Sequence, residues 1–359
     1  MFESNTTDLL WEVFFQCTVD LDYTSRHMLL FFLYLIAFVV GLAANGVVVW
    51  VNWPQRHSSN PEVFCTLNIC VSHLMVMTVM PIFLLEVMMN HVWMWGKFLC
   101  LFTNFIYEFN YYSTSFFLAY LAVERYQMVA RGPAAARPWG PDEKRRRALM
   151  CAGLWIFALL LSPVLVSNVQ VVEYHTPGCY LLPDRNYALW MVVITMTSFT
   201  FQFLIPGAVI LTCNWLAAQA LKRSPELRSS SAVDVKMYHV YSAVFIAHWL
   251  PYHIVCLLIM VDDLNPLILS CDSTNIVYYS AYVMLALSHF HYITNPVLYN
   301  FLQPGFRRSL LRLVARYVRG QTQCSAGGGV EVGVKNKVRS AAAGPRKISN
   351  ASTSQSDVD

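Results

Sequence analysis

The sequence predicts an all-α membrane protein: a bundle of seven transmembrane helices followed by an amphipathic surface helix. Three observations predict this fold. The chain has 359 residues and is 56% hydrophobic and only 13% charged, whereas an average soluble domain is about 25% charged. Seven apolar stretches are long enough to cross a hydrocarbon core of ~30 Å. Basic residues are also strongly biased to one side of these stretches.

The distribution of charge orients the predicted bundle. Of the 25 Lys and Arg residues, only Arg26, Lys97 and Arg185 lie on one side of the spans, and the other 22 lie on the opposite side. The basic side is cytoplasmic by the positive-inside rule, so the N-terminus is expected outside. The outer side carries eleven acids: Glu3, Asp8, Glu12, Asp20, Asp22, Glu86, Glu173, Asp184, Asp262, Asp263 and Asp272.

The first three spans follow a polar outer tail, residues 1–27, in which Asn5 opens a glycosylation sequon. The first span is Met28–Val51 and the second is Glu62–Met89. The third, Lys97–Val129, contains acidic and amide residues that lipid would not tolerate on its surface. We therefore expect the third span to be an inner helix of the bundle.

The remaining spans are separated by a basic inner run, a long outer loop and a short acidic outer loop. The outer loops are residues 167–186 and 262–272. The four spans are Ala148–Val166, Tyr187–Leu221, Met237–Val261 and Ser273–Leu302.

Three further segments follow the N-terminal tail in the predicted organisation. Residues 28–303 form the bundle, and residues 304–319 show apolar positions at helical spacing with arginines on the polar side, which predicts a helix on the lipid surface. Residues 320–359 are rich in Gly, Ser, Ala and Lys and are expected to be disordered. Phosphorylation of the serines near its end would attract a basic arrestin groove, although a merely solvated tail is the alternative.

Four cysteines, Cys17, Cys100, Cys179 and Cys271, fall on the outer side, where thiols oxidise. Four cysteines allow three pairings. We favour Cys100–Cys179, which attaches the long outer loop to the third span, and Cys17–Cys271, which attaches the tail to the seventh. The alternative is that one or both pairs are free thiols.

Three groups of residues, two at the inner side and one in the middle of the membrane, suggest moving parts. In Glu124-Arg125-Tyr126 the glutamate can neutralise the arginine and hold an inactive state, although an arginine there can also be a simple membrane anchor. Trp249 and Pro251 mark a kink in the sixth span, with Phe245 one turn away. Asn295-Pro296 and Tyr299 mark another at the inner end of the seventh.

In this order, the motifs resemble those of the rhodopsin-like (class A) G-protein-coupled receptors. The resemblance covers residues 28–318 and is carried by Asn45, Cys100, Glu124-Arg125-Tyr126, Trp155, Pro206, Trp249-Leu250-Pro251 and Asn295 through Tyr299. It implies a plasma-membrane receptor with an extracellular ligand, arrestin and possible G-protein partners. We expect no enzyme activity, because no protease, nucleotide-binding or catalytic-triad motif occurs, and we expect no cofactor, metal or nucleic-acid partner.

A finer resemblance, carried by Phe38–Leu42, Tyr111-Tyr112-Ser113 and Cys151–Trp155, is to receptors that neighbour the chemokine and atypical chemokine receptors. It implies capture and internalisation of a chemokine with little G-protein signalling. The second cysteine pair is also similar to the chemokine-receptor arrangement. The alternatives are a conventional peptide receptor that activates a G protein and, more remotely, a transporter or channel, which the lack of internal repeats disfavours.

The sequence departs from the family at the centre of the bundle. His73 stands where the family has an aspartate that holds sodium together with positions matching Asn110, Thr114, His291 and Asn295. Without this carboxylate we expect no sodium binding. His73 and His291 could instead bind a transition metal or sense pH, although burial favours a neutral, hydrogen-bonded pair. Asn214 and His248 also replace a tyrosine and a cysteine of the family pattern.

The outer halves of the spans carry the candidate ligand-binding residues. Glu86 and Glu108 are ionisable residues within spans, which makes them functional candidates. The fold implied by the resemblance places Tyr107, Trp249 and His253 near them, and Asp262 and Asp263 follow the sixth span. Such an acidic mouth would attract a basic peptide or chemokine. The alternative is that these acids only mirror the sorting of Lys and Arg.

Overall fold

The computed structural model describes residues 23–56, 60–132, 140–173, 176–225, 234–265 and 268–326. Asn5, Cys17 and the serine-rich tail predicted above lie outside these residues. The chain forms two compact units, Met1–Arg312 and Leu313–Asp359. The helical bundle belongs to the first unit, and the C-terminal part of the last helix belongs to the second.

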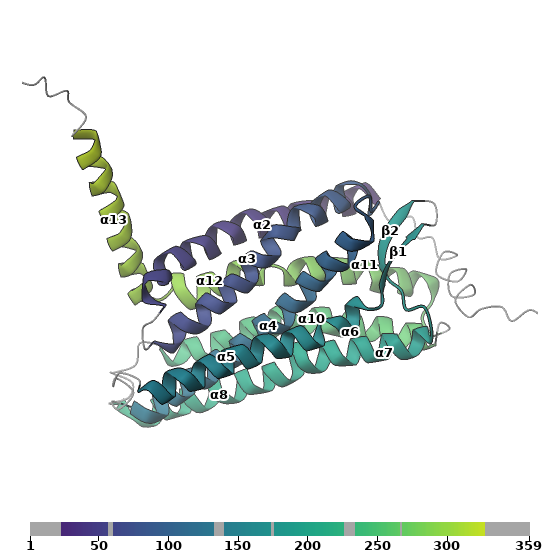
Figure 1. The fold of residues 1–359 in the computed structure, drawn as a ribbon. Helices are drawn as coiled ribbons and strands as arrows, with labels where there is room; N and C mark the ends of the chain where they lie inside the picture. The colour runs from purple at the N-terminus through teal and green to yellow at the C-terminus, as the bar shows by residue number, and fades with distance from the viewer. Residues whose placement is uncertain are drawn as a thin grey trace, which may run out of the picture. The chain divides into compact units, whose positions relative to one another are not determined.

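Seven long helical segments make up the bundle in the described part of the chain, as predicted (Figure 1). Successive segments contact one another, the fourth and fifth through the rings of Phe157 and Phe201, whose centres lie 5.6 Å apart. The first segment also contacts the seventh, which closes the bundle. The segments are α2 (Tyr23–Asn52), α3 (Pro61–Met88), α4 (Gly96–Arg131), α5 (Pro141–Leu161) with α6 (Pro163–Val166), α7 (Tyr187–Ser198) with η3 (Phe199–Leu204) and α8 (Ile205–Arg223), α10 (Val235–Leu264), and α11 (Cys271–Ser288) with α12 (His291–Pro296) and η4 (Val297–Phe301).

Helix starts are set by local sequence. At α3 the Asn60 side chain accepts a hydrogen bond from the Glu62 backbone N–H at 2.9 Å, and Pro61 occupies the first helical position. The Ser270 side chain accepts in the same way from Ser273 at the start of α11. A short 3₁₀ turn, η1 (Trp53–Gln55), ends the first segment, and a final helix, α13 (Pro304–Ala326), begins at a proline.

The burial of the helices identifies which of them face lipid. Five helical segments in the described residues are long and apolar enough to cross a membrane: those built on α2, α3, α5, α7–α8 and α10. Only 11% of the most apolar window of α5 is buried, so this segment presents most of its surface to lipid. In contrast, α4 buries Glu108, Asn110 and Thr114 and packs against α3, α5 and α8. It is the inner helix that its polar residues predict.

The fifth and seventh segments are not the continuous α-helices that the sequence suggests. Each contains a π-helical turn, η3 and η4, beside a proline. Proline lacks an N–H group and leaves the carbonyl four residues earlier without its helical donor. Pro296 frees the carbonyl of Tyr292 in this way, and the Asn45 Nδ2 atom of α2 donates to it at 2.8 Å.

Helices α2, α3 and α12 approach closely at Gly41. A Cβ atom at Gly41 would lie 3.1 Å from the Tyr292 Cβ and 3.2 Å from the Met77 Cε. Asn45, one turn later, is fully buried and also donates to the Gly41 carbonyl at 2.8 Å. A residue without a side chain at position 41 therefore allows the first and seventh segments to meet backbone to backbone.

The outer loop 167–186 contains a β-hairpin, which the sequence did not predict. Strands β1 (Val169–Glu173) and β2 (Pro177–Leu181) are antiparallel, with Val171 opposite Cys179. The predicted Cys100–Cys179 disulfide is confirmed and attaches the hairpin to α4. The Trp93 backbone N–H adds a hydrogen bond to the Pro177 carbonyl at 2.7 Å. We call this end of the bundle the disulfide end and the opposite end, which contains Arg125, the arginine end.

Candidate functional site

Asp262 and Asp263 belong to the last turn of α10 and not to a loop. The Thr274 hydroxyl donates to Asp262 Oδ2 at 3.2 Å, and the Tyr278 hydroxyl donates to Asp263 Oδ1 at 3.1 Å. Both donors lie on α11. The two aspartates thus connect the sixth and seventh segments through neutral hydroxyls, which leave the negative charge of a carboxylate uncompensated.

The predicted pocket residues lie on two sides of α4. Tyr107 faces α3 and the seventh segment, with its ring 5.6 Å from both Phe83 and His289. Glu108, the next residue, faces the fifth segment, where the Gln202 Nε2 donates to its Oε2 at 2.9 Å. Successive helical residues point about 100° apart, which is why the two side chains face different neighbours. The acids of the predicted pocket are therefore divided between two places.

Gln202, the partner of Glu108, is a buried polar residue that our reading of the sequence missed. It lies in the π-turn η3 and is 1% exposed. Near it, His253 is also 1% exposed and packs its ring 5.4 Å from Phe203 and 6.3 Å from Trp249. A glutamine four residues before Pro206, inside an apolar span, was the available signal.

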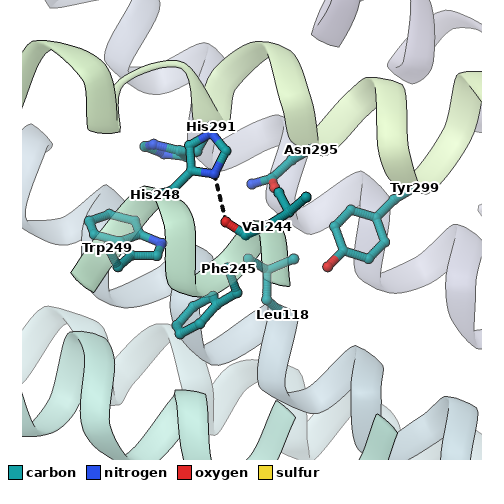
Figure 2. Close-up of a pocket in the computed structure, with 8 residues that line it drawn as sticks. All are labelled: Leu118, Val244, Phe245, His248, Trp249, His291, Asn295 and Tyr299. Carbon is teal, nitrogen blue, oxygen red and sulfur yellow. Dashed lines mark hydrogen bonds between the residues drawn. The ribbon is translucent and has the colours of Figure 1, made fainter. Parts of the chain in front are cut away.

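Trp249 lies beneath this region with 1% of its surface exposed. Tyr111 meets it edge to face at 5.3 Å, and the His291 ring lies 5.2 Å away. Figure 2 shows the residues that line a small cavity beside Trp249, which would hold about one water molecule. Its lining comes from α4, α10 and the seventh segment: Leu118, Val244, Phe245, His248, Trp249, His291, Asn295 and Tyr299.

His73 is fully buried at the centre of the bundle. Asn45 uses its amide hydrogens on two carbonyls, so its Oδ1 accepts from the His73 Nδ1–H at 3.0 Å. The His73 and His291 rings lie 5.1 Å apart, edge to face. His291 uses its own Nδ1 on the Ser288 carbonyl at 2.7 Å. The two histidines therefore contact each other through their rings while each hydrogen-bonds elsewhere.

Asn110 and Thr114 lie in the same layer, and the Asn110 Nδ2 donates to Thr114 Oγ1 at 3.4 Å. The Asn110 Nδ2 donates to Ser72 Oγ at 2.8 Å, and the Tyr292 hydroxyl donates to Asn110 Oδ1 at 3.2 Å. Within the described ranges, no three His, Cys, Asp or Glu residues are arranged to hold a metal ion. This layer is thus a network of neutral hydrogen bonds.

At the arginine end, Arg125 does not pair with Glu124, contrary to our expectation. The Arg125 Nε donates to Glu62 Oε1 at 2.7 Å, and its guanidinium carbon lies 4.2 Å from the ring centre of Tyr241 and 5.0 Å from that of Tyr299. Arg125 is only 2% exposed. We call Glu62, Tyr241 and Tyr299 the arginine cage.

Glu124 faces the fourth segment instead. It accepts from the Tyr120 hydroxyl at 2.6 Å and from Arg147 Nη2 at 2.5 Å, and Arg146 lies 3.6 Å away. Adjacent residues of a helix face different neighbours, which explains why the sequence neighbours do not pair. Tyr126 is only partly buried. Glu62 was detectable as the acid at the inner start of the second span.

The structure accounts for three of the four outer cysteines. Cys100 and Cys179 are joined, with their Cα atoms 5.8 Å apart. Cys271 is also disulfide-bonded. Cys17 lies outside the described residues, so the Cys17–Cys271 pairing stays a prediction.

Comparison with known proteins agrees with this architecture. The pattern of the 7 transmembrane receptor (rhodopsin family) matches residues 44–299. The chain is 33% identical to G-protein coupled receptor 182 of Homo sapiens over 312 residues, which are 87% of this chain and 76% of that protein. It is 27% identical to atypical chemokine receptor 3 of Rattus norvegicus over 296 residues, which are 80% of each. These relatives are receptors and not enzymes, which is also what we predicted.

The family pattern begins at Ala44 and ends at Tyr299, and so extends from the first helix of the closed bundle to the last turn of the seventh. The finer resemblance noted in the sequence is likewise confirmed, since G-protein coupled receptor 182 and atypical chemokine receptor 3 are both among the similar proteins. The chain is a multi-pass membrane protein and belongs to the rhodopsin family of seven-transmembrane receptors.

Proposed function

We propose that this chain is a plasma-membrane receptor, with its N-terminus outside, that captures a basic peptide or chemokine at the disulfide end. One observation carries the proposal. The four ion pairs of the described chain all lie at the arginine end and join Arg125 to Glu62, Arg131 to Glu143, and Arg146 and Arg147 to Glu124. The described acids of the disulfide end take part in none of them, so their charge remains available to a basic ligand.

The similar proteins support a chemokine as the ligand class. One relative is named an atypical chemokine receptor, and the chain matches it over 80% of its own length. The disulfide-tied hairpin and the aspartates of α10 would border the entrance for such a ligand. A large protein ligand would contact this rim, and a short extended part of it would enter between the helices.

The arginine end supports capture and internalisation with weak G-protein coupling. Arg125 is enclosed by the arginine cage and is 2% exposed. Asn214 replaces the tyrosine of the family pattern and donates to Ser242 at 3.0 Å, which occupies it within the bundle. Arrestin is then the expected inner partner, and it would bind the phosphorylated tail.

A second candidate is a conventional receptor that activates a G protein. Tyr299 and Arg125 favour it, because these two family residues are in place and contact each other at 5.0 Å. The two candidates use the same ligand site and differ only in the events that binding triggers at the arginine end.

The test starts with a screen of labelled chemokines and basic peptides on cells that express the receptor. Cells without it and a charge-reversed acidic peptide are the controls. A bound ligand is then traced in two assays, namely uptake into cells and nucleotide exchange on G proteins in purified membranes. Uptake without exchange supports capture, whereas ligand-dependent exchange shows the conventional receptor. If no basic ligand binds in the screen, both candidates are wrong.

A further inference from the structure

Four consecutive cations, Lys144 to Arg147, follow the first turn of α5 at the arginine end. Arg147 is buried and bonds to Glu124, whereas Lys144, Arg145 and Arg146 are exposed. The side chains of Lys144 and Arg145 form no hydrogen bond and no ion pair within the described part of the chain. We call Lys144, Arg145 and Arg146 the α5 basic patch.

The α5 basic patch lies on the side of the helix that faces lipid. Leu149 and Met150 are 63% and 44% exposed, and α5 presents most of its apolar surface to lipid. They follow Arg145 and Arg146 by four residues, so each pair lies on one side of the helix. The side chains of the patch therefore meet lipid and not another helix.

The rise of the helix places the α5 basic patch at the depth of the lipid headgroups. Four helical residues span about 6 Å, and the headgroup region on each side of the hydrocarbon core is roughly 5–8 Å thick. With Leu149 at the edge of the hydrocarbon core, Arg145 lies among the headgroups. Arginine and lysine side chains keep their apolar stems along the helix and extend their charged ends to the polar layer.

The acids of the first turn of α5 do not neutralise this patch. Glu143 pairs with Arg131 of α4 at 2.6 Å. Asp142 and Glu143 precede the patch in the sequence, so they lie farther from the lipid-facing part of the helix. The positive charge of Lys144 and Arg145 thus remains available to an anion.

Arg146 is the cation of the patch that can change its partner. Its Nη2 atom lies 3.6 Å from Glu124 Oε1, and its side chain is 43% exposed. When Arg146 turns to the membrane, Glu124 keeps the Tyr120 hydroxyl at 2.6 Å and Arg147 at 2.5 Å. The movement leaves no buried carboxylate unpaired, so little opposes it.

We propose that the α5 basic patch binds the headgroup of an anionic phospholipid in the leaflet at the arginine end. Arginine pairs with phosphate oxygens through two parallel hydrogen bonds, and lysine adds a point charge. The acyl chains of such a lipid lie beside Leu149 and Met150 and hold its phosphate at this depth. An acidic protein would first have to displace lipid from this side of α5. The site requires no extracellular ligand and so goes beyond the proposed function.

The first test measures thermal unfolding of the purified receptor in phosphatidylcholine nanodiscs with rising amounts of phosphatidylserine or phosphatidylinositol bisphosphate. The proteins are the wild type, Lys144→Gln/Arg145→Gln, Arg145→Gln, and the matched control Lys222→Gln/Arg223→Gln. The control removes the same charge from two exposed cations at the arginine end of α8. Glycerophosphoserine, the serine headgroup without acyl chains, is the soluble probe and is added to nanodiscs of phosphatidylcholine alone.

Both anionic lipids are expected to raise the melting temperature of the wild type and of the control. An anionic leaflet attracts each nearby cation by a factor of about five, so Lys144→Gln/Arg145→Gln needs roughly 20- to 30-fold more lipid for the same shift. Arg145→Gln needs about fivefold more, and it decides the matter if the double variant shows no unfolding transition in phosphatidylcholine alone.

Three results of this test would overturn the proposal. Equal shifts in Lys144→Gln/Arg145→Gln and in the control would mean that only the general field of the arginine end acts on the lipid. An equal shift with glycerophosphoserine would mean that the patch binds a soluble phosphate. No shift of the wild type with either anionic lipid would mean that it binds neither.

The second test locates the lipid. A phosphatidylserine with a photoactivatable group in its acyl chain, close to the ester, is crosslinked to the receptor in nanodiscs, and the modified residues are identified by mass spectrometry. Crosslinks at residues 148–150 are expected in the wild type and in the control, and their loss is expected in Lys144→Gln/Arg145→Gln. The same crosslinks in all three proteins, or crosslinks on other helices alone, contradict the proposal.

Discussion

Glu124 and Arg125 are adjacent in the sequence, yet their side chains bind residues of two different helices. Arg125 contacts Glu62 on α3 and two tyrosine rings, while Glu124 contacts Arg147 on α5. The sequence motif marks both residues as functional, but it does not predict which residues they bind. Partner choice depends on the rotation of α4 against its neighbours, and no local pattern encodes this rotation.

The arginine cage predicts the effect of Glu62→Gln. This change removes the charge that fixes Arg125, so we expect the free energy of unfolding to fall by about 1–3 kcal/mol. We also expect arrestin recruitment without ligand to rise several-fold, because Arg125 becomes free to leave the cage. Thermal unfolding and a recruitment assay in cells measure the two effects.

Glu143→Gln is the matched control for this prediction. Glu143 of α5 pairs at 2.6 Å with Arg131, which lies on α4 as Arg125 does. Both side chains of this pair are partly exposed, Glu143 at 27% and Arg131 at 48%. An exposed pair contributes about 0–1 kcal/mol. If Glu62→Gln and Glu143→Gln behave alike, the arginine cage does not restrain Arg125.

At the centre of the bundle, His73→Asp is expected to make ligand affinity depend on sodium. The change places a carboxylate in a layer that already contains the oxygens of Asn110, Ser72 and Thr114. Carboxylate, amide and hydroxyl oxygens are ligands that hard cations prefer. Affinity is measured while sodium replaces choline at constant ionic strength, with His73→Asn as the uncharged control. Equal affinity at all sodium concentrations would contradict our interpretation of this position.

At the scale of single elements, the apolar stretches predicted most helix ends closely. The second span was predicted as Glu62–Met89, and α3 is Pro61–Met88. The fourth was predicted to begin at Ala148, but α5 begins at Pro141. Hydrophobicity marks only the part of a helix that lies in lipid, whereas the charged first turns of α5 continue beyond it.

The π-turns and the hairpin were not predicted, because each depends on distant contacts. The carbonyl that Pro296 frees is satisfied by Asn45 on another helix. The hairpin is stabilised by the Cys100–Cys179 bridge and by Trp93. Strand β1 reads as Val-Gln-Val-Val-Glu, which is too short a run to distinguish from an irregular loop.

Removal of the Cys100–Cys179 bridge by serine at both positions is expected to destabilise the receptor. The bridge closes a sequence separation of 79 residues, for which chain entropy gives roughly 4–5 kcal/mol. Ligand affinity falls as well, because the hairpin is no longer anchored. Thermal unfolding and binding are measured against Cys213→Ser, which removes a free cysteine of α8. Similar behaviour of the two variants would show that the bridge is dispensable.

For the whole molecule, the separation of charge was visible in the sequence, and the structure shows how each end uses it. At the arginine end the acids pair with arginines, as Glu62 and Glu124 do. At the disulfide end Asp262 and Asp263 accept from neutral hydroxyls. Counting charges predicts the net field of each end. It does not predict which acids are neutralised, because that depends on side-chain partners.

This field predicts a salt-dependent association rate for a basic ligand. The distance over which charges act falls from ~10 Å at 0.1 M salt to ~3 Å at 1 M. We therefore expect the association rate constant to fall about tenfold or more from low to high salt, while the dissociation rate constant changes little. Surface plasmon resonance on immobilised receptor measures both. An association rate that does not change with salt would exclude electrostatic steering.

The close approach at Gly41 has a consequence for inherited variation. Position 41 is distant in the sequence from every residue placed at the two ends, and a methyl group there would press on Tyr292 and Met77 at 3.1–3.2 Å. A Gly41→Ala carrier is expected to display fewer receptors on each cell, because misfolded chains are degraded, while each surviving receptor binds with normal affinity. Surface counts and affinity, measured separately, distinguish such a shortage of receptor from a defect of its binding site.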